Sequence, residues 1–340
     1  MKLTTILITA TNAVLPIVIL IGLGYFLRRC NFITEEFVKI GNKLVFNVCL
    51  PCMLFVNVYE IESLSDIRWD VVIYCCAMIL VIFLIGTLIA VMATPEPRRR
   101  GVIAQSAFRS NMAIIGLALA ASLGGQDAVA VAAVVSAFTV PIFNILAVVA
   151  LTMFVQQGGS QNRFAGVLKK IVTNPLILGI VAGMICLLIR QLQMTLWGKP
   201  LFLLSRELKF AYTGLENLGK ITSPFALLVL GGQFTFSAIK DLRKEILAGA
   251  MSRIVLAPLV GIGVAVALGF VGVLDFDTSV YPALIAVFGS PTAVSSAIMA
   301  RQMQHDEQLA TQLVVWTSIG SIFTIFLTVC MLMSVGLLAV

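Results

Sequence analysis

A cationic and an amide side chain lie two positions apart in an otherwise apolar stretch of the sequence. The segment FRSNMAIIG, residues 108–116, places Arg109, Ser110 and Asn111 in a row between long hydrophobic runs. A guanidinium group matches a carboxylate through two parallel hydrogen bonds. These residue types therefore predict a binding site for an organic anion.

A second interruption lies in another apolar run, at GSPT, residues 289–292. Pro291 has no backbone N–H and its ring clashes with the preceding helical turn, while Gly289 adds backbone freedom. A helix that restarts after such a break points its positive end at the break, where an anion is favoured. We therefore predict a substrate site formed by Arg109, Ser110, Asn111, Ser290, Pro291 and Thr292.

The composition requires that these residues lie in a membrane. The 340 residues are 60% hydrophobic and 11% charged, with a mean hydropathy of +1.05, whereas soluble domains carry about 25% charged residues. About 20 apolar residues cross a bilayer as a helix. Runs without Asp, Glu, Lys, Arg or His cover residues 71–93, 221–239, 254–274 and 278–300. The chain is thus expected to be an all-α polytopic membrane protein.

Ten membrane spans are expected. The first is not a signal peptide, because it is too long and ends in RRC rather than in small residues. The ten spans cover residues 5–27, 40–58, 71–93, 101–124, 127–155, 171–190, 217–237, 246–270, 280–302 and 307–337.

The positive charges predict how the spans are oriented. The odd-numbered connections hold thirteen Lys and Arg residues and the even-numbered ones hold four. By the positive-inside rule the odd connections are cytoplasmic, which places both termini outside, in a bacterial cytoplasmic membrane. The net charge of +7 is thereby explained without nucleic-acid binding.

The two halves, residues 1–158 and 159–340, resemble each other. Sixteen residues separate Asn111 from Asp127, and sixteen separate Pro291 from Glu307. Because each half has an odd number of spans, five, the second half has the opposite orientation in the membrane to the first. Inverted repeats of this kind are typical of transporters, whose substrate site lies near the bilayer midplane. Arg109 lies about 8 residues, or roughly 12 Å, into the fourth span, and GSPT lies at a similar depth in the ninth. We expect these two spans to be broken helices whose interruptions lie at the same depth.

Arg109 has no acidic neighbour in the sequence. Glu96 is the one acidic residue between Asp70 and Asp127, and an arginine at the centre of a membrane helix costs at least about 2.5–3.5 kcal/mol. An incoming carboxylate would supply the missing charge. The alternatives are that Arg109 extends toward the cytoplasm or pairs with helix-end carbonyls or a distant acid.

Several segments resemble the auxin efflux carrier family, which includes plant PIN carriers and bacterial carboxylate transporters. The resemblance covers nearly the whole chain and rests on LPIVILIGLGYFLRR (15–29), NKLVFNVCLPCMLF (42–55), SNMAIIGLAL (110–119), TNPLILGIVAGMI (173–185) and SPFALLVLGGQF (223–234). Asn111 and Gly116 match the family's crossover Asn and the Gly that follows it. Where many members have Gly-x-Pro, this chain has Gly116, Leu117 and Ala118, so Ala118 stands in place of the proline.

The resemblance implies a fold and a mechanism. Spans 1, 2, 6 and 7 would form a scaffold, and spans 3–5 and 8–10 a moving transport domain with crossed helices. It further implies elevator-like alternating access and a homodimer. The function expected is secondary transport of small mono- or dicarboxylates.

Other polar and kink-forming residues flank the expected crossing. We expect a supporting cavity from Asn47, Thr222, Ser223 and Gln233, although each could serve only interhelical hydrogen bonding. Helix breaks or hinges are expected at Pro51, Pro224, Gly116 and Gly289, whereas Asn144 is expected to serve helix packing.

Two other functions remain open. A sodium-coupled symporter of the bile-acid type shares the expected fold, and neither H⁺ nor Na⁺ coupling can be assigned. A membrane enzyme is the remoter alternative, since Asp66 and Asp70 have no second acidic cluster with which to hold a metal. His305 is expected in a solvated external loop, and no cofactor or metal is expected.

Overall fold

The computed structural model describes residues 3–60, 68–155, 173–200, 202–234 and 238–338. In these ranges the chain is helical, and the only extended pairing among them is one isolated bridge. The helices, including the π-helical turns η1 to η5, are α1 (Leu3–Arg29), α2 (Glu35–Leu44), η1 (Val45–Cys49), α3 (Leu50–Tyr59), α4 (Trp69–Ala93), α5 (Pro97–Phe108), η2 (Met112–Gly116), α6 (Leu117–Met153), α8 (Pro175–Trp197), α9 (Leu204–Glu207), α10 (Lys209–Gln233), α11 (Ala238–Met251), η3 (Ser252–Leu256), η4 (Leu259–Gly263), α12 (Val264–Phe270), α13 (Val280–Leu284), η5 (Ile285–Gly289), α14 (Ser295–Gln302) and α15 (Glu307–Ser334).

Six helical segments within the described ranges are long and apolar enough to cross a membrane. They are Glu35–Tyr59, Trp69–Ala93, Asp127–Met153, Pro175–Trp197, Lys240–Phe270 and Glu307–Ser334. Four of the ten predicted spans are not in this set, namely 5–27, 101–124, 217–237 and 280–302, and the second and fourth of these are each divided by a break in the helix. The all-helical membrane fold expected from the sequence is confirmed at this level.

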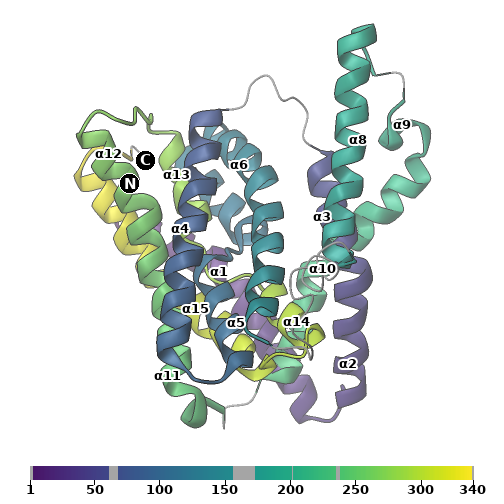
Figure 1. The fold of residues 1–340 in the computed structure, drawn as a ribbon, viewed down its shortest axis with the longest axis vertical. Helices are drawn as coiled ribbons and strands as arrows, with labels where there is room; N and C mark the ends of the chain where they lie inside the picture. Colours follow the sequence, from purple (N-terminus) through teal and green to yellow (C-terminus); the bar gives the residue numbers. More distant parts are fainter. Residues whose placement is uncertain (1–2, 61–67, 156–172, 201, 235–237, 339–340) are drawn as a thin grey trace, which may run out of the picture.

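The helices form two groups. In Figure 1, α2, α3, α8 and α10 stand together at the right, and α4, α5, α6, α11, α12, α13 and α15 stand further to the left, with α14 between the two groups. Within the first group α3 packs on α8 and α10, and α1 packs along α10. Within the second, α4 packs on α5 and α6, and α11 on α15. The two groups also contact each other, because α1 packs against α15 as well as along α10, and α14 contacts η1 and α10.

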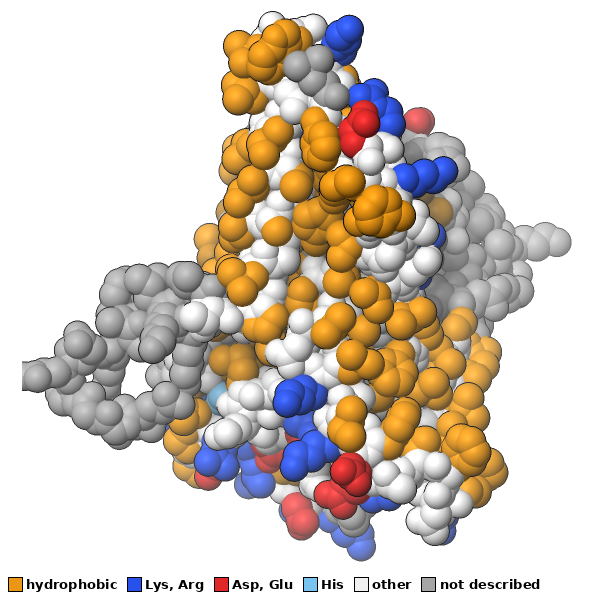
Figure 2. All heavy atoms as spheres, turned by 90° about the vertical axis from the view of Figure 1, so that its right-hand side faces the viewer, with side chains coloured by type: hydrophobic (Ala, Val, Ile, Leu, Met, Phe, Trp, Pro, Cys, Tyr) orange, Lys and Arg blue, Asp and Glu red, His pale blue; other side chains and the backbone are white. Residues whose placement is uncertain are grey.

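The outer surface is apolar where lipid would cover it. Figure 2 shows hydrophobic side chains over most of the face that carries α8 and α10, with acidic and basic side chains gathered toward its two ends. Exposed residues along α8 alone include Leu178, Val181, Ile185, Leu188, Leu192 and Leu196. An apolar exterior of this extent is typical of an integral membrane protein.

Two of the long helical segments contain a proline next to a π-helical turn. Pro51 follows η1 closely, and Pro258 lies between η3 and η4. A proline cannot donate to the carbonyl four residues earlier and clashes with it, and a π-helical turn changes that hydrogen-bonding register. The helices that contain Pro51 and Pro258 are thus locally irregular at these positions.

Glycine allows α1 and α10 to approach each other closely. A Cβ atom on Gly24 would overlap the backbone carbonyl of Leu228, and one on Gly231 would overlap that of Ile21. Because the obstacle is backbone on both sides, no side-chain rotation can relieve it. The contact therefore depends on the absence of a side chain at both positions.

We predict that Gly24→Ala destabilises the protein by roughly 1–3 kcal/mol, because the two backbones must move apart. The measurement is thermal unfolding of the purified protein in detergent. Gly22→Ala is the matched control on the same helix, since a Cβ atom there meets nothing within 4 Å. Equal melting temperatures for the two variants would show that the helix contact does not depend on Gly24.

Candidate functional site

The two interruptions predicted from the sequence lie together. Arg109, just after α5, and Ser290, just after η5, both have extended backbone conformations. The backbone N–H of Asn111 donates to the carbonyl of Pro291 at 2.8 Å, and that of Ala293 donates to the carbonyl of Arg109 at 3.1 Å. The two extended segments thus form one antiparallel bridge, Ser110 with Thr292.

Gly116 sets how closely the helices on either side of this bridge approach. A Cβ atom on Gly116 would lie 2.8 Å from the carbonyl oxygen of Ala286, so the turn η2 lies directly against η5. Gly289 is buried at the end of η5, near Ile285 and Ile325. Both glycines predicted as helix breaks lie next to the bridge.

A second buried arginine, Arg253, binds both broken helices. Its side chain is 0% exposed. Nη1 donates to the carbonyls of Ala107 and Phe108 at 3.2 and 3.1 Å, at the end of α5. Nη2 donates to those of Val287 and Phe288 at 2.8 and 3.2 Å, and Nε to that of Ser290 at 2.8 Å. These are the last carbonyls of two helices, which no longer have helical partners.

The sequence analysis missed Arg253. The residue lies in the predicted span 246–270, one position before the charge-free run 254–274. The signal that singled out Arg109, an arginine inside a predicted span, was therefore also present for Arg253. The π-helical turn η3, which carries Arg253, has no comparable signature in the sequence.

A cavity of about 50 Å³ lies beside the bridge. A water molecule needs about 10–15 Å³ on this scale, so the cavity holds a few. Its walls come from both helix groups. Its polar lining residues are Arg109, Ser110, Asn111, Asn144, Thr222, Ser223 and Ser295, and its apolar ones are Leu50, Met53, Leu54, Val140, Phe143, Ala226, Ala293 and Val294.

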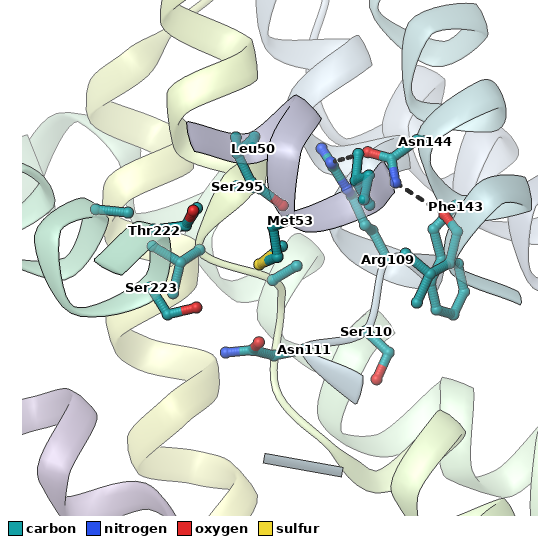
Figure 3. Close-up of a pocket in the computed structure, with 15 residues that line it drawn as sticks. Leu50, Met53, Arg109, Ser110, Asn111, Phe143, Asn144, Thr222, Ser223 and Ser295 are labelled. Atoms are coloured by element: carbon teal, nitrogen blue, oxygen red, sulfur yellow. Dashed lines mark hydrogen bonds between the residues drawn. The ribbon is translucent and has the colours of Figure 1, made fainter. Parts of the chain in front are cut away.

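Arg109 is held beside this cavity by neutral side chains. The residue is 2% exposed. Nη2 donates to Oδ1 of Asn144 at 2.7 Å, and Nη1 lies 3.4 Å from Oε1 of Gln105 and 3.2 Å from Sδ of Met299. None of the ion pairs among the described residues includes Arg109. Asn144, expected only to pack, instead orients the guanidinium group (Figure 3).

The opposite side of the cavity carries hydrogen-bonding groups. Figure 3 shows the amide of Asn111 extending toward the side where Thr222 and Ser223 lie. Nδ2 of Asn111 is buried and has no hydrogen-bond partner. The helix α14 begins at Ser295 on the cavity wall, with the positive end of its dipole there. A cation, an amide donor and a helix N-terminus therefore surround one small space.

Not all predicted site residues face this cavity. Ser290, Pro291 and Thr292 take part in the crossing through their backbones, and Ala293, Val294 and Ser295 line the cavity instead. Asn47 is exposed and donates to its own helix at Lys43. Asn47 therefore lies on the outer side of its helical segment, while Leu50 of the same segment lines the cavity.

Gln233 and the two predicted hinges also lie elsewhere. Gln233 lines a separate cavity of about 430 Å³, with Arg28, Arg29 and Arg301. Pro51 is in the first turn of α3, and Pro224 lies within α10, exposed. Of the predicted supporting residues, Thr222 and Ser223 line the cavity and Asn47 and Gln233 do not.

The prediction for His305 is wrong. His305 is 8% exposed rather than solvated, and its Nδ1 lies 2.9 Å from the carbonyl of Arg98. It therefore belongs to the same end of the molecule as the basic connection Arg98–Arg100, which the positive-inside rule assigns to the cytoplasm. The neighbouring Asp306 pairs with Arg99 at 3.0 Å, which ties the loop to that end.

Of the two acidic residues considered for a membrane enzyme, Asp66 and Asp70, the structure describes only Asp70. Asp66 lies outside the described residues. Asp70 pairs with Arg68 at 2.9 Å, and Arg68 also pairs with Asp277 at 2.6 Å. The Ser279 hydroxyl and then Arg68 hold the pKa of Asp277 below its ordinary value. In the described ranges no three His, Cys, Asp or Glu side chains are placed to hold a metal, and all seven cysteines are free.

The amino-acid sequence is similar to those of known membrane transport proteins. The family described as membrane transport protein matches residues 9–329. An uncharacterized transporter of Methanothermobacter thermautotrophicus is 25% identical over 93% of this chain and 96% of that protein. The protein PIN-LIKES 7 of Arabidopsis thaliana is 22% identical over 91% of this chain and 93% of that protein.

The different surroundings of the two arginines lead to a stability prediction. Arg253→Met is expected to cost about 3–5 kcal/mol, because it removes the donors of five buried carbonyls at once. Arg109→Met should cost less, about 1–3 kcal/mol, because its partners are side chains that can turn toward water in the cavity. Thermal unfolding in detergent measures both. A larger loss for Arg109→Met would mean that Arg253 does not hold the crossing together.

Proposed function

Because the chain belongs to the family of membrane transport proteins that includes the auxin efflux carriers, we propose that it is a secondary transporter of small organic anions. The observation that carries this proposal is the position of Arg109, buried on the wall of a cavity without an acidic partner among the described residues. In a membrane protein, an unbalanced buried cation facing a cavity indicates a site for a negative ligand.

The charges at the crossing support one carboxylate as the minimum ligand. Each helix C-terminus carries about half a negative charge, so the ends of α5 and η5 together offset about one positive charge. Arg253 supplies that charge and is bound to both ends. Arg109 remains uncompensated, and the carboxylate of a substrate would balance it in the geometry that a guanidinium group favours.

The polar groups around the cavity suggest how the ligand is held. Arg109 binds the carboxylate, and Asn144 fixes the orientation of its guanidinium group. Asn111 supplies an amide N–H that has no other partner. Ser223 and Ser295 contact the rest of a small, polar substrate.

The size of the cavity favours a mechanism in which its two walls separate. A space of about 50 Å³ does not admit a dicarboxylate without movement. One wall belongs to α3 and α10, and the other to the broken helices and α6. Met53 and Ser223 also line a second cavity of about 300 Å³, which offers a route to the site. Sliding of the crossing group against α3 and α10 would provide elevator-like alternating access.

The remaining architecture follows the same proposal. Ten spans in a five-plus-five inverted repeat would put the crossing near the midplane. Residues 1–158 and 159–340 would form the repeats, with a scaffold of spans 1, 2, 6 and 7, and a homodimer through that scaffold. Both termini would lie outside a bacterial cytoplasmic membrane.

Ligand-induced stabilisation tests the anion site. We expect malate, malonate, pyruvate or indole-3-acetate to raise the Tm of the wild-type protein and not that of Arg109→Gln. A ligand at one hundred times its Kd contributes about 2.7 kcal/mol, which thermal unfolding resolves. Repeating the assay with choline in place of Na⁺ separates an uncoupled or proton-coupled carrier from a sodium-coupled symporter of the bile-acid type.

The control for this experiment is Arg28→Gln, which removes an arginine outside the cavity. It should retain the full ligand-induced shift. An unchanged shift in a folded Arg109→Gln variant would exclude Arg109 from the site. Stabilisation by no carboxylate would count against the whole anion proposal.

Cysteine labelling tests the orientation. Cys30 is exposed, and the other six cysteines are buried or half-buried. If the connection after α1 is cytoplasmic, a membrane-impermeant maleimide should label Cys30 only after the cells are permeabilised. Cys30→Ser provides the background. Labelling in intact cells would place this connection outside and reverse the topology.

A further inference from the structure

The charge of Arg253 is held by main-chain oxygens. The guanidinium group has five N–H donors, and five hydrogen bonds join it to the carbonyls of residues 107, 108, 287, 288 and 290. Each donor is thus used once. None of the ion pairs in the described part of the chain involves Arg253, and the side chain is fully buried.

Such a set of oxygens is what a small cation binds. Rings of backbone carbonyls replace the hydration shell of K⁺ in channels, and the C-terminal ends of broken helices coordinate Na⁺ in transporters. Here the oxygens come from two helix ends that are far apart in the sequence. With no positive charge between them, the two negative helix ends would repel each other.

We propose that the guanidinium group of Arg253 is a built-in cation that occupies a carbonyl-lined cation site at the crossing. The side chain reaches this site from a third helical segment, the turn η3. The cation therefore stays with the protein through every transport cycle, and it remains between the two helix ends whether or not a substrate is bound.

The second buried arginine differs in each of these respects. Arg109 donates to side chains and lines the cavity, whereas Arg253 donates only to backbone carbonyls and is not among the cavity-lining residues. One arginine is thus available to a ligand and the other is part of the framework. Arg109 serves as the matched control for any test of Arg253.

The test is whether removal of Arg253 creates a requirement for a cation. We would measure the Tm of wild type, Arg253→Ala and Arg109→Ala at one ionic strength in choline, sodium or methylguanidinium chloride, with no carboxylate ligand present. The wild type should have the same Tm in all three salts. Arg253→Ala should lose stability in choline and recover at least half of that loss in sodium or methylguanidinium, while Arg109→Ala should show no such recovery.

The opposite results would overturn the proposal. Equal Tm values for Arg253→Ala in the three salts would make Arg253 a hydrogen-bonding clamp without a cation site, and sodium-specific stabilisation of the wild type would place the cation elsewhere. If Arg253→Ala does not fold, Arg253→Lys decides, because a tethered ammonium group should restore folding in choline. Failure of that variant as well would also count against a site for a positive charge.

This inference goes beyond the proposed function, since it concerns the framework of the crossing and not the residues that would bind the substrate. The salt experiment contains no substrate, and the carboxylate experiment does not alter Arg253. A failure of the cation-site proposal can therefore be distinguished from a failure of the proposed anion transport.

Discussion

The structure depends on how two helices can end inside a hydrophobic protein. A helix that stops leaves its last carbonyl groups without partners, and burying them unsatisfied is costly. Here α5 and η5 stop at the same place, and Arg253 donates to both ends. The backbone bridge between Ser110 and Thr292 and the cavity beside it lie where these two ends meet.

Two arginines divide the electrostatic tasks at the centre of the molecule. Arg253 is matched by the partial charges of two helix ends, while Arg109 has neutral partners and faces a cavity. Desolvating a cation without an opposite charge is unfavourable, so a negative charge placed in the cavity would stabilise Arg109. The segments that present Arg109 supply one wall of the cavity, and α3 and α10 supply the other.

The helical membrane class and the two interruptions were predictable, because hydropathy and a misplaced Arg or Pro are local signals in the sequence. The partners of these residues were not. Arg253 was overlooked although it lies inside a predicted span, and the Arg109–Asn144 contact joins positions 35 residues apart along the chain. Asn47 and Gln233 were placed in the site from their spans alone, but the rotation of each helix about its axis decides which way a side chain faces. That rotation is set by packing, for which the sequence has no simple periodicity here.

The bridge at the crossing is made by main-chain atoms, and this affects how the protein can evolve. Backbone hydrogen bonds do not depend on side-chain identity, so substitutions at the buried Ser110 and Thr292 by residues of similar size leave the bridge intact. Only the donors at Asn111 and Ala293 forbid proline, which has no N–H. The contact that joins these two distant parts of the chain is therefore specified by backbone geometry, and side chains of similar size can replace one another there while the architecture persists.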